Sequence, residues 1–106
     1  MNLINPDVKA MITLTRKNPV MSGYRPAHDI CGYLTTGVQQ YINKNELKCG
    51  ETVEGTITFI TPEYYPHSLA VGMRLTFQEG NRVTGYADIL EIYNELLERL
   101  PESEKQ

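Results

Sequence analysis

The sequence predicts an all-β domain, a barrel or a sandwich, from two observations. Hydrophobic and polar residues alternate along several stretches, a pattern typical of antiparallel strands that bury one face. Residues that favour turns separate these stretches at regular intervals, as they do in barrels and sandwiches. The chain has 106 residues, of which 41% are hydrophobic and 22% are charged. These values suit one globular domain with a single core.

Three stretches alternate clearly enough to be assigned as strands. The first covers residues 8–15 and buries one row of side chains: Val8, Ala10, Ile12 and Leu14. The second covers residues 52–60 and buries a similar row around Gly55: Val53, Ile57 and Phe59. The third covers residues 71–78, and its inward row is predicted to be Val71, Met73, Leu75 and Phe77. Val and Thr, which favour strands, recur in these stretches.

Turn chemistry separates the predicted strands. Gly80-Asn81 predicts a tight hairpin, because both residues tolerate a positive φ. Thr61-Pro62 marks the end of a strand, since proline lacks the N–H group that a central ladder requires. Residues that favour turns also bracket two longer connections, near 18–23 and 43–50.

The carboxyl-terminal part changes to a helical period. Apolar residues recur at helical spacing on one face, namely Ile89, Tyr93, Leu96, Leu97 and Leu100. Pro101 ends this pattern. Alternatively, the strand that begins near Arg82 continues to Ile92, and a shorter helix covers 93–100. In both cases we place a single β domain with a short carboxyl-terminal helix at residues 1–100, followed by a polar tail at 101–106.

Net charge and hydropathy limit the partners of the chain. The formal net charge is −3, which argues against general nucleic-acid binding, because such binding draws on Lys and Arg to displace counterions. The amino terminus has no apolar run of the length that a signal peptide needs. No stretch approaches the roughly 20 apolar residues of a membrane span. We therefore expect a soluble, cytoplasmic protein that makes no membrane contact.

The sequence gives little indication of catalysis. Cys31 and Cys49 are expected to be free thiols in a reducing cytosol, with a disulfide as the alternative. They lack zinc-site spacing, and neither a metal nor a cofactor is expected. No G-x-x-x-x-G-K-[ST] loop occurs, so the chain alone cannot hydrolyse GTP in the P-loop manner. A small enzyme using His28, Asp29 or Cys31 is a remote alternative, because His28 and Cys31 are predicted to lie on opposite faces of one strand.

Three motifs in order carry a resemblance to a known family. They are Gly-Tyr-Arg-Pro at 23–26, Tyr-Leu-Thr-Thr-Gly-Val at 33–38 and a Gly-x-Arg-x-x-x-x-Glu-Gly-x-Arg segment at 72–82. Together they resemble the third domain of bacterial elongation factor Tu, here without its GTPase domain. The resemblance covers most of the chain, from about Val8 to Ile92.

The resemblance implies a six-stranded antiparallel Greek-key barrel. In the family this domain packs on the other two domains and touches the T-stem of tRNA. The residues at the matching motif positions are therefore candidates for partner binding: Arg25, Thr35, Thr36, Arg74, Glu79 and Arg82. The alternative for three of them is purely structural. Arg74, Glu79 and Arg82 can form cross-strand ion pairs beside the tight turn.

The chain departs from the family pattern at three places that bear on partner binding. Leu34 stands where the family usually has a basic residue. After Arg25-Pro26 the family tends to have Gln and an aromatic residue, whereas this chain has Ala27-His28-Asp29. The connection from 62 to 72 is longer than in the family and carries Tyr64, Tyr65 and His67. Tyrosine is enriched at binding hot spots, so this loop is a candidate partner site. The structural alternative is that one of the tyrosines closes an open end of the barrel.

We therefore expect a non-catalytic interaction module that acts through a protein partner. It is either a partner of a translation GTPase or a mimic of the elongation-factor domain, for example an inhibitor or an immunity-type protein. The alternative is an RNA-binding module, with tRNA as its ligand. The apolar face of the carboxyl-terminal helix either covers a barrel opening or forms a homodimer.

Overall fold

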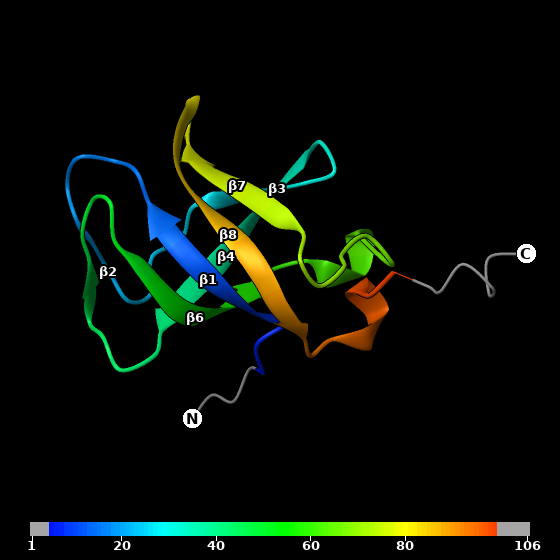
Figure 1. The fold of residues 1–106 in the computed structure, drawn as a ribbon. Coiled ribbons are helices and arrows are strands. Elements are labelled where there is room, and N and C mark those ends of the chain that lie inside the picture. Colours follow the sequence, from blue (N-terminus) through cyan, green and yellow to red (C-terminus); the bar gives the residue numbers. More distant parts are fainter. Residues whose placement is uncertain (1–4, 100–106) are drawn as a thin grey trace, which may run out of the picture.

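The computed structural model describes residues 5–99 and shows a closed antiparallel β-barrel (Figure 1). Around the barrel, the strands follow the order β1-β6-β4-β3-β7-β8, and β8 closes on β1. Their bounds are β1 Val8–Leu14, β3 Ala27–Ile30, β4 Tyr33–Tyr41, β6 Thr52–Phe59, β7 Arg74–Glu79 and β8 Arg82–Ile92. Two further short strands, β2 (Val20–Met21) and β5 (Glu46–Leu47), pair with each other in the longer connections. The predicted all-β class and the six-stranded antiparallel barrel are confirmed.

Alternating burial in β1 and β6 builds the barrel core. Every second residue of β1 is buried from Val8 to Leu14, and the predicted inward row of β6 is buried as well. Ile12 is paired with Val53 of β6 on one side and with Ala87 of β8 on the other. These fully buried side chains provide the apolar area that stabilises the barrel.

Strand β7 begins three residues later than the predicted start of the third strand. Val71 is exposed, and the inward row of β7 begins at Leu75. The reason is a turn, in which Met73 N–H donates to Ala70 O at 3.1 Å and Gly72 adopts a φ of 92°. Alternation in sequence cannot distinguish such a turn from extended chain when the turn residues themselves alternate.

Two tight hairpins set the barrel register. Gly80 and Asn81 connect β7 to β8, as predicted, and Gly80 takes a positive φ of 56°. Cys31 and Gly32 connect β3 to β4, with φ values of 52° and 94°. Cys31 therefore lies in a turn and not on the strand to which the sequence assigned it. Positive φ at both Cys31 and Gly32 matches the right-handed twist of β3 and β4.

The carboxyl-terminal helix predicted over 89–100 is wrong for the described residues. Strand β8 continues to Ile92, as the alternative predicted. The shorter helix that this alternative placed over 93–100 is not observed in the described residues, where only the three-residue 3₁₀ helix η2 (Glu95–Leu97) follows. Ile89 is paired with Ala10, so strand pairing with β1 prevails over the helical spacing. Leu100 and the predicted tail at 101–106 lie outside the described residues. In the part of the chain that the structure covers, no helix is long and apolar enough to span a membrane.

Candidate interaction surface

The tyrosine loop lies at one end of the barrel. It begins at Phe59, passes through the 3₁₀ helix η1 (Pro62–Tyr64) and returns to β7 (Figure 1). The structure separates the two tyrosines. Tyr64 is 72% exposed, whereas Tyr65 is partly buried against the core and lies 6.5 Å from the ring of Tyr33. The two tyrosines therefore differ, since Tyr65 packs against the core and Tyr64 exposes its side chain.

Segments distant in sequence hold this loop in place. His67, at a φ of 56°, donates its backbone N–H to Leu96 O at 2.7 Å, and its Nδ1 lies 2.9 Å from Glu98 O. Leu69 N–H donates to Leu97 O at 2.8 Å, and both leucine side chains are fully buried. His67 therefore has a structural role as well as an exposed side chain. The loop presents Tyr64 from a fixed backbone, which lowers the entropy lost on binding.

The β3–β4 hairpin brings further apolar residues to the same end. Asp29 Oδ1 accepts a hydrogen bond of 2.7 Å from Gly32 N–H, and Cys31 Sγ lies 3.6 Å from Ser68 O of the tyrosine loop. We use the name aromatic end for the four large, mainly exposed side chains that gather here. Their exposed fractions are 68% for Tyr33, 50% for Leu34, 61% for Ile60 and 72% for Tyr64.

Residues from the second motif lie next to the aromatic end. Ile60 N–H donates to Thr36 O at 3.1 Å, and Thr36 is partly exposed. Arg25 is exposed and lines a shallow groove together with Ile60 and Pro62. Thr35 points into the barrel, is buried, and has no hydrogen-bond partner for its hydroxyl among the described residues. Arg25 and Thr36 are therefore accessible to a partner, and Thr35 is not.

Arg74, Glu79 and Arg82 do not form the ion-pair group that was the structural alternative. Arg74 donates to both carboxylate oxygens of Asp88, at 2.7 and 3.1 Å, and its guanidinium lies 3.9 Å from the ring centre of Tyr86. Glu79 pairs with Arg16 and not with Arg74. Arg82 is the register partner of Glu79 across the turn and is exposed.

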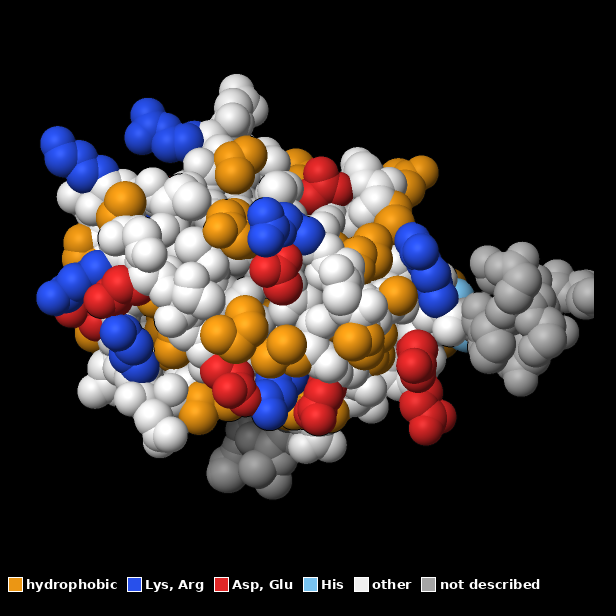
Figure 2. Space-filling model, viewed as in Figure 1, with side chains coloured by type: hydrophobic (Ala, Val, Ile, Leu, Met, Phe, Trp, Pro, Cys, Tyr) orange, Lys and Arg blue, Asp and Glu red, His pale blue; other side chains and the backbone are white. Residues whose placement is uncertain are grey.

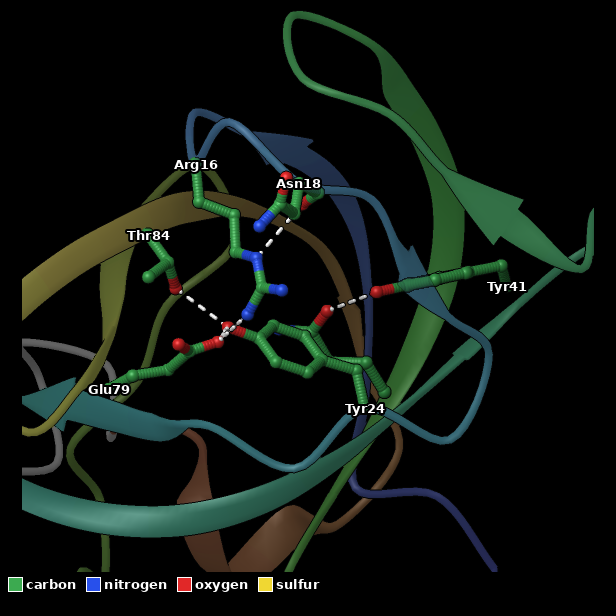
Figure 3. A network of polar contacts seen from close by, with 7 residues as sticks. Arg16, Asn18, Tyr24, Tyr41, Glu79 and Thr84 are labelled. Atoms are coloured by element: carbon green, nitrogen blue, oxygen red, sulfur yellow. Dashed lines mark hydrogen bonds and ion pairs between the residues drawn. The ribbon is translucent and has the colours of Figure 1, made fainter.

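Glu79, at the end of β7, is the centre of a polar network (Figure 3). Arg16 and Tyr24 both donate to its carboxylate, and the Tyr24 hydroxyl also lies 2.8 Å from Thr84 Oγ1. Burial and the adjacent carboxylate raise the pKa of Tyr24 to about 12. The Tyr24 hydroxyl and the Arg16 guanidinium lower the pKa of Glu79. The network ties the β1–β2 connection to the β7–β8 hairpin.

The three residues of the remote catalytic alternative do not meet. His28 is fully buried between Phe59 and Phe77, each with its ring centre 5.6 Å away. Its Nε2 lies 3.1 Å from Gln39 Nε2, and burial lowers the pKa of His28 to about 4. Cys31 is exposed on the outside, and Asp29 is engaged with Gly32. The site therefore lacks the contact between nucleophile and base that covalent catalysis requires.

Cys31 and Cys49 are both exposed free thiols, as expected. Among residues 5–99, no group of three His, Cys, Asp or Glu side chains is placed to hold a metal ion.

Three residues of the aromatic end, Tyr33, Leu34 and Ile60, were not predicted as exposed from the sequence. Tyr33 and Leu34 lie within a recognised motif, but their exposure depends on the Cys31-Gly32 turn. A cysteine at positive φ is uncommon, so Gly32 was the only residue that indicated a turn in the sequence. Ile60 directly follows the alternating residues of β6 and is itself apolar, so its residue type does not indicate an exposed position.

Comparisons with known proteins leave the function open. A scan against models of protein families finds no match, and a search of the curated proteins finds no similar sequence. Neither comparison adds sequence evidence to the three motifs that resemble the third domain of elongation factor Tu.

Proposed function

We propose that this chain is a non-catalytic module that binds a protein partner through the aromatic end. The observation that carries the proposal is the gathering of four exposed apolar side chains, Tyr33, Leu34, Ile60 and Tyr64, on a backbone held by hydrogen bonds. Exposed apolar groups that gather in this way are typical of interaction sites. Tyrosine in particular offers a large contact area at a small cost in side-chain entropy.

The motif resemblance suggests the setting of this binding. A stand-alone relative of the elongation-factor domain would meet translation GTPases, either as a partner or as a mimic that acts as an inhibitor or immunity-type protein in the cytoplasm. The strand order supports the resemblance, because β1 lies beside β6 and not beside β3. Such a neighbour arrangement is that of a Greek key.

An RNA-binding function has weaker support. Of the motif arginines that would face RNA, Arg74 is engaged with Asp88, while Arg25 and Arg82 are exposed. The net charge of −3 opposes approach to a phosphate backbone. RNA is therefore an outcome that the following experiment must be able to detect.

Affinity capture from a host lysate with matched variants tests the proposal. We compare the wild-type chain with Tyr64→Ala and with Met21→Ala, which removes an exposed apolar side chain from β2. One dominant protein should be captured by the wild type and by Met21→Ala, and lost with Tyr64→Ala. Capture of RNA that neither substitution changes would contradict the proposal.

A further inference from the structure

Among residues 5–99, the aromatic end includes a strand edge that no other strand covers. Pairing between β4 and β6 begins at Gly37, so residues 33–36 of β4 pair only with β3 on their other side. Along the uncovered side, the described residues supply one backbone hydrogen bond beyond the ladder, from Ile60 N–H to Thr36 O. An edge of this kind is a template for an extended segment of another chain.

Apolar side chains lie along this edge at the spacing that strand addition uses. Leu34 and Thr36 point outward from β4, and Ile60 continues from the end of β6 beside Thr36. Tyr64 follows Ile60 closely, because its N–H donates to Thr61 O at 3.1 Å. Side chains on alternate positions of an added strand can contact these residues, while backbone hydrogen bonds supply affinity.

Carboxylates surround the aromatic end. Asp29 is the register partner of Leu34, Glu63 precedes Tyr64, and Glu98 lies on the segment that pairs with Leu69. Glu95 belongs to η2, which packs against η1. These four described carboxylates outnumber the two guanidinium groups near the aromatic end, those of Arg25 and Arg99. Among residues 5–99, none of the four carboxylates forms a salt bridge.

The other end of the barrel has the opposite character. Lys17, Lys44 and Lys48 lie in the connections around β2 and β5, and Arg82 lies at the tip of the β7–β8 hairpin. Carboxylates are present at this end too, because Glu46 is part of β5 and Glu51 pairs with Lys44. Lys17, Lys48 and Arg82 form no salt bridge among residues 5–99, so the cations are in excess here. Figure 2 shows Lys and Arg side chains gathered at that end. A charge distribution of this kind orients a charged partner and favours the approach of a cationic segment to the aromatic end.

We propose that the aromatic end binds an extended, Lys- or Arg-bearing segment of a partner protein, which adds as a strand to the edge of β4 at residues 33–36. Its apolar side chains contact Leu34, Ile60 and Tyr64, and its cations meet the surrounding carboxylates and the tyrosine faces. This inference rests on the proposed function, since it names the chemistry of the segment that the partner presents.

Synthetic peptides test the inference without knowledge of the partner. One fluorescent peptide alternates Val with Lys, and its counterpart alternates Val with Glu. We expect fluorescence anisotropy to show binding of the Lys peptide, and NMR to place the shifted amides at residues 33–36. Glu63→Gln should weaken this binding about threefold at low salt, as the loss of one exposed ion pair does. Glu46→Gln, a charge-matched change on β5, should leave it unchanged.

Two outcomes would overturn the inference. The first is equal or tighter binding of the Glu peptide, and the second is a set of shifted amides away from residues 33–36. If neither peptide binds while Tyr64→Ala still abolishes capture of the protein partner, the strand-addition inference fails and the proposed function stands. If Tyr64→Ala leaves capture intact, the proposed function itself fails.

Discussion

At the scale of single residues, His28 links core packing to acid stability. It is fully buried, and burial lowers its pKa from 6.5 to about 4. The folded state therefore favours neutral His28, and this contribution is complete above pH 6.5. It is lost as the pH falls from 6.5 towards 4, where the unfolded chain binds a proton that the fold does not. We expect a loss of about 3 kcal/mol in unfolding free energy over this range, measured by urea titration.

A matched variant separates His28 from other acid effects. His28→Gln should flatten the pH dependence between 6.5 and 4, because glutamine does not ionise in this range. Glutamine can still accept the hydrogen bond from Gln39. The two chains differ in this side chain alone, so a difference between their pH profiles belongs to His28. Parallel pH profiles for His28→Gln and the wild type would show that another group is responsible.

Tyr24 gives a second prediction at the residue scale. Its hydroxyl donates to Glu79 and lies next to Thr84 Oγ1, so Tyr24→Phe removes a contact between the β2–β3 connection and the β7–β8 hairpin. We expect a decrease of about 1 kcal/mol in unfolding free energy, typical of one net hydrogen bond. Tyr33→Phe is the control, because Tyr33 is mainly exposed. Equal effects of the two substitutions in urea unfolding would rule out the network as a source of stability.

At the scale of elements, local sequence patterns predicted the strands whose burial simply alternates along the chain. Strands β1 and β6 agree with their predicted stretches because each buries every second residue. The carboxyl-terminal part was ambiguous because Ile89, Leu96 and Leu97 also fit a helical face. β8 pairs with both β1 and β7, and this pairing stabilises a strand in place of a helix. The periodicity of one segment does not reveal such pairing.

The candidate site was predicted in part for the same reason. Tyr64 was recognisable from residue type within a long loop, whereas Tyr33, Leu34 and Ile60 reach the surface through a turn and a strand end. The partners Arg16 and Glu79 are far apart in sequence and meet only because the barrel closes. Contacts of this kind depend on topology, which no local pattern specifies.

The segment around η2 gives a prediction at the element scale. Leu97 is fully buried and packs with the loop at Leu69, so Leu97→Ala should decrease the unfolding free energy by about 3 kcal/mol. The adjacent Leu96 is largely exposed, and Leu96→Ala should cost less than about 1 kcal/mol. Equal costs in thermal or urea unfolding would contradict the burial of Leu97. Leu97 and Ile89 face the core, so these two side chains are not part of an exposed apolar face.

At the scale of the whole molecule, charge limits the ligand class. With a net charge of −3, we expect tRNA to bind no tighter than about 10 μM at physiological salt. Fluorescence anisotropy at low and physiological salt measures this affinity. Tight tRNA binding that Arg25→Gln weakens would favour the RNA-binding alternative over the protein-binding function, with Lys17→Gln as the charge-matched control.

The central claim is that the aromatic end contacts a protein directly. Site-specific photocrosslinking tests it most directly, with benzoylphenylalanine in place of Tyr64 and, in a control chain, in place of Met21. The account predicts one dominant protein adduct from position 64 and none of the same mass from position 21. An RNA adduct from position 64, or the same protein adducts from both positions, would contradict it.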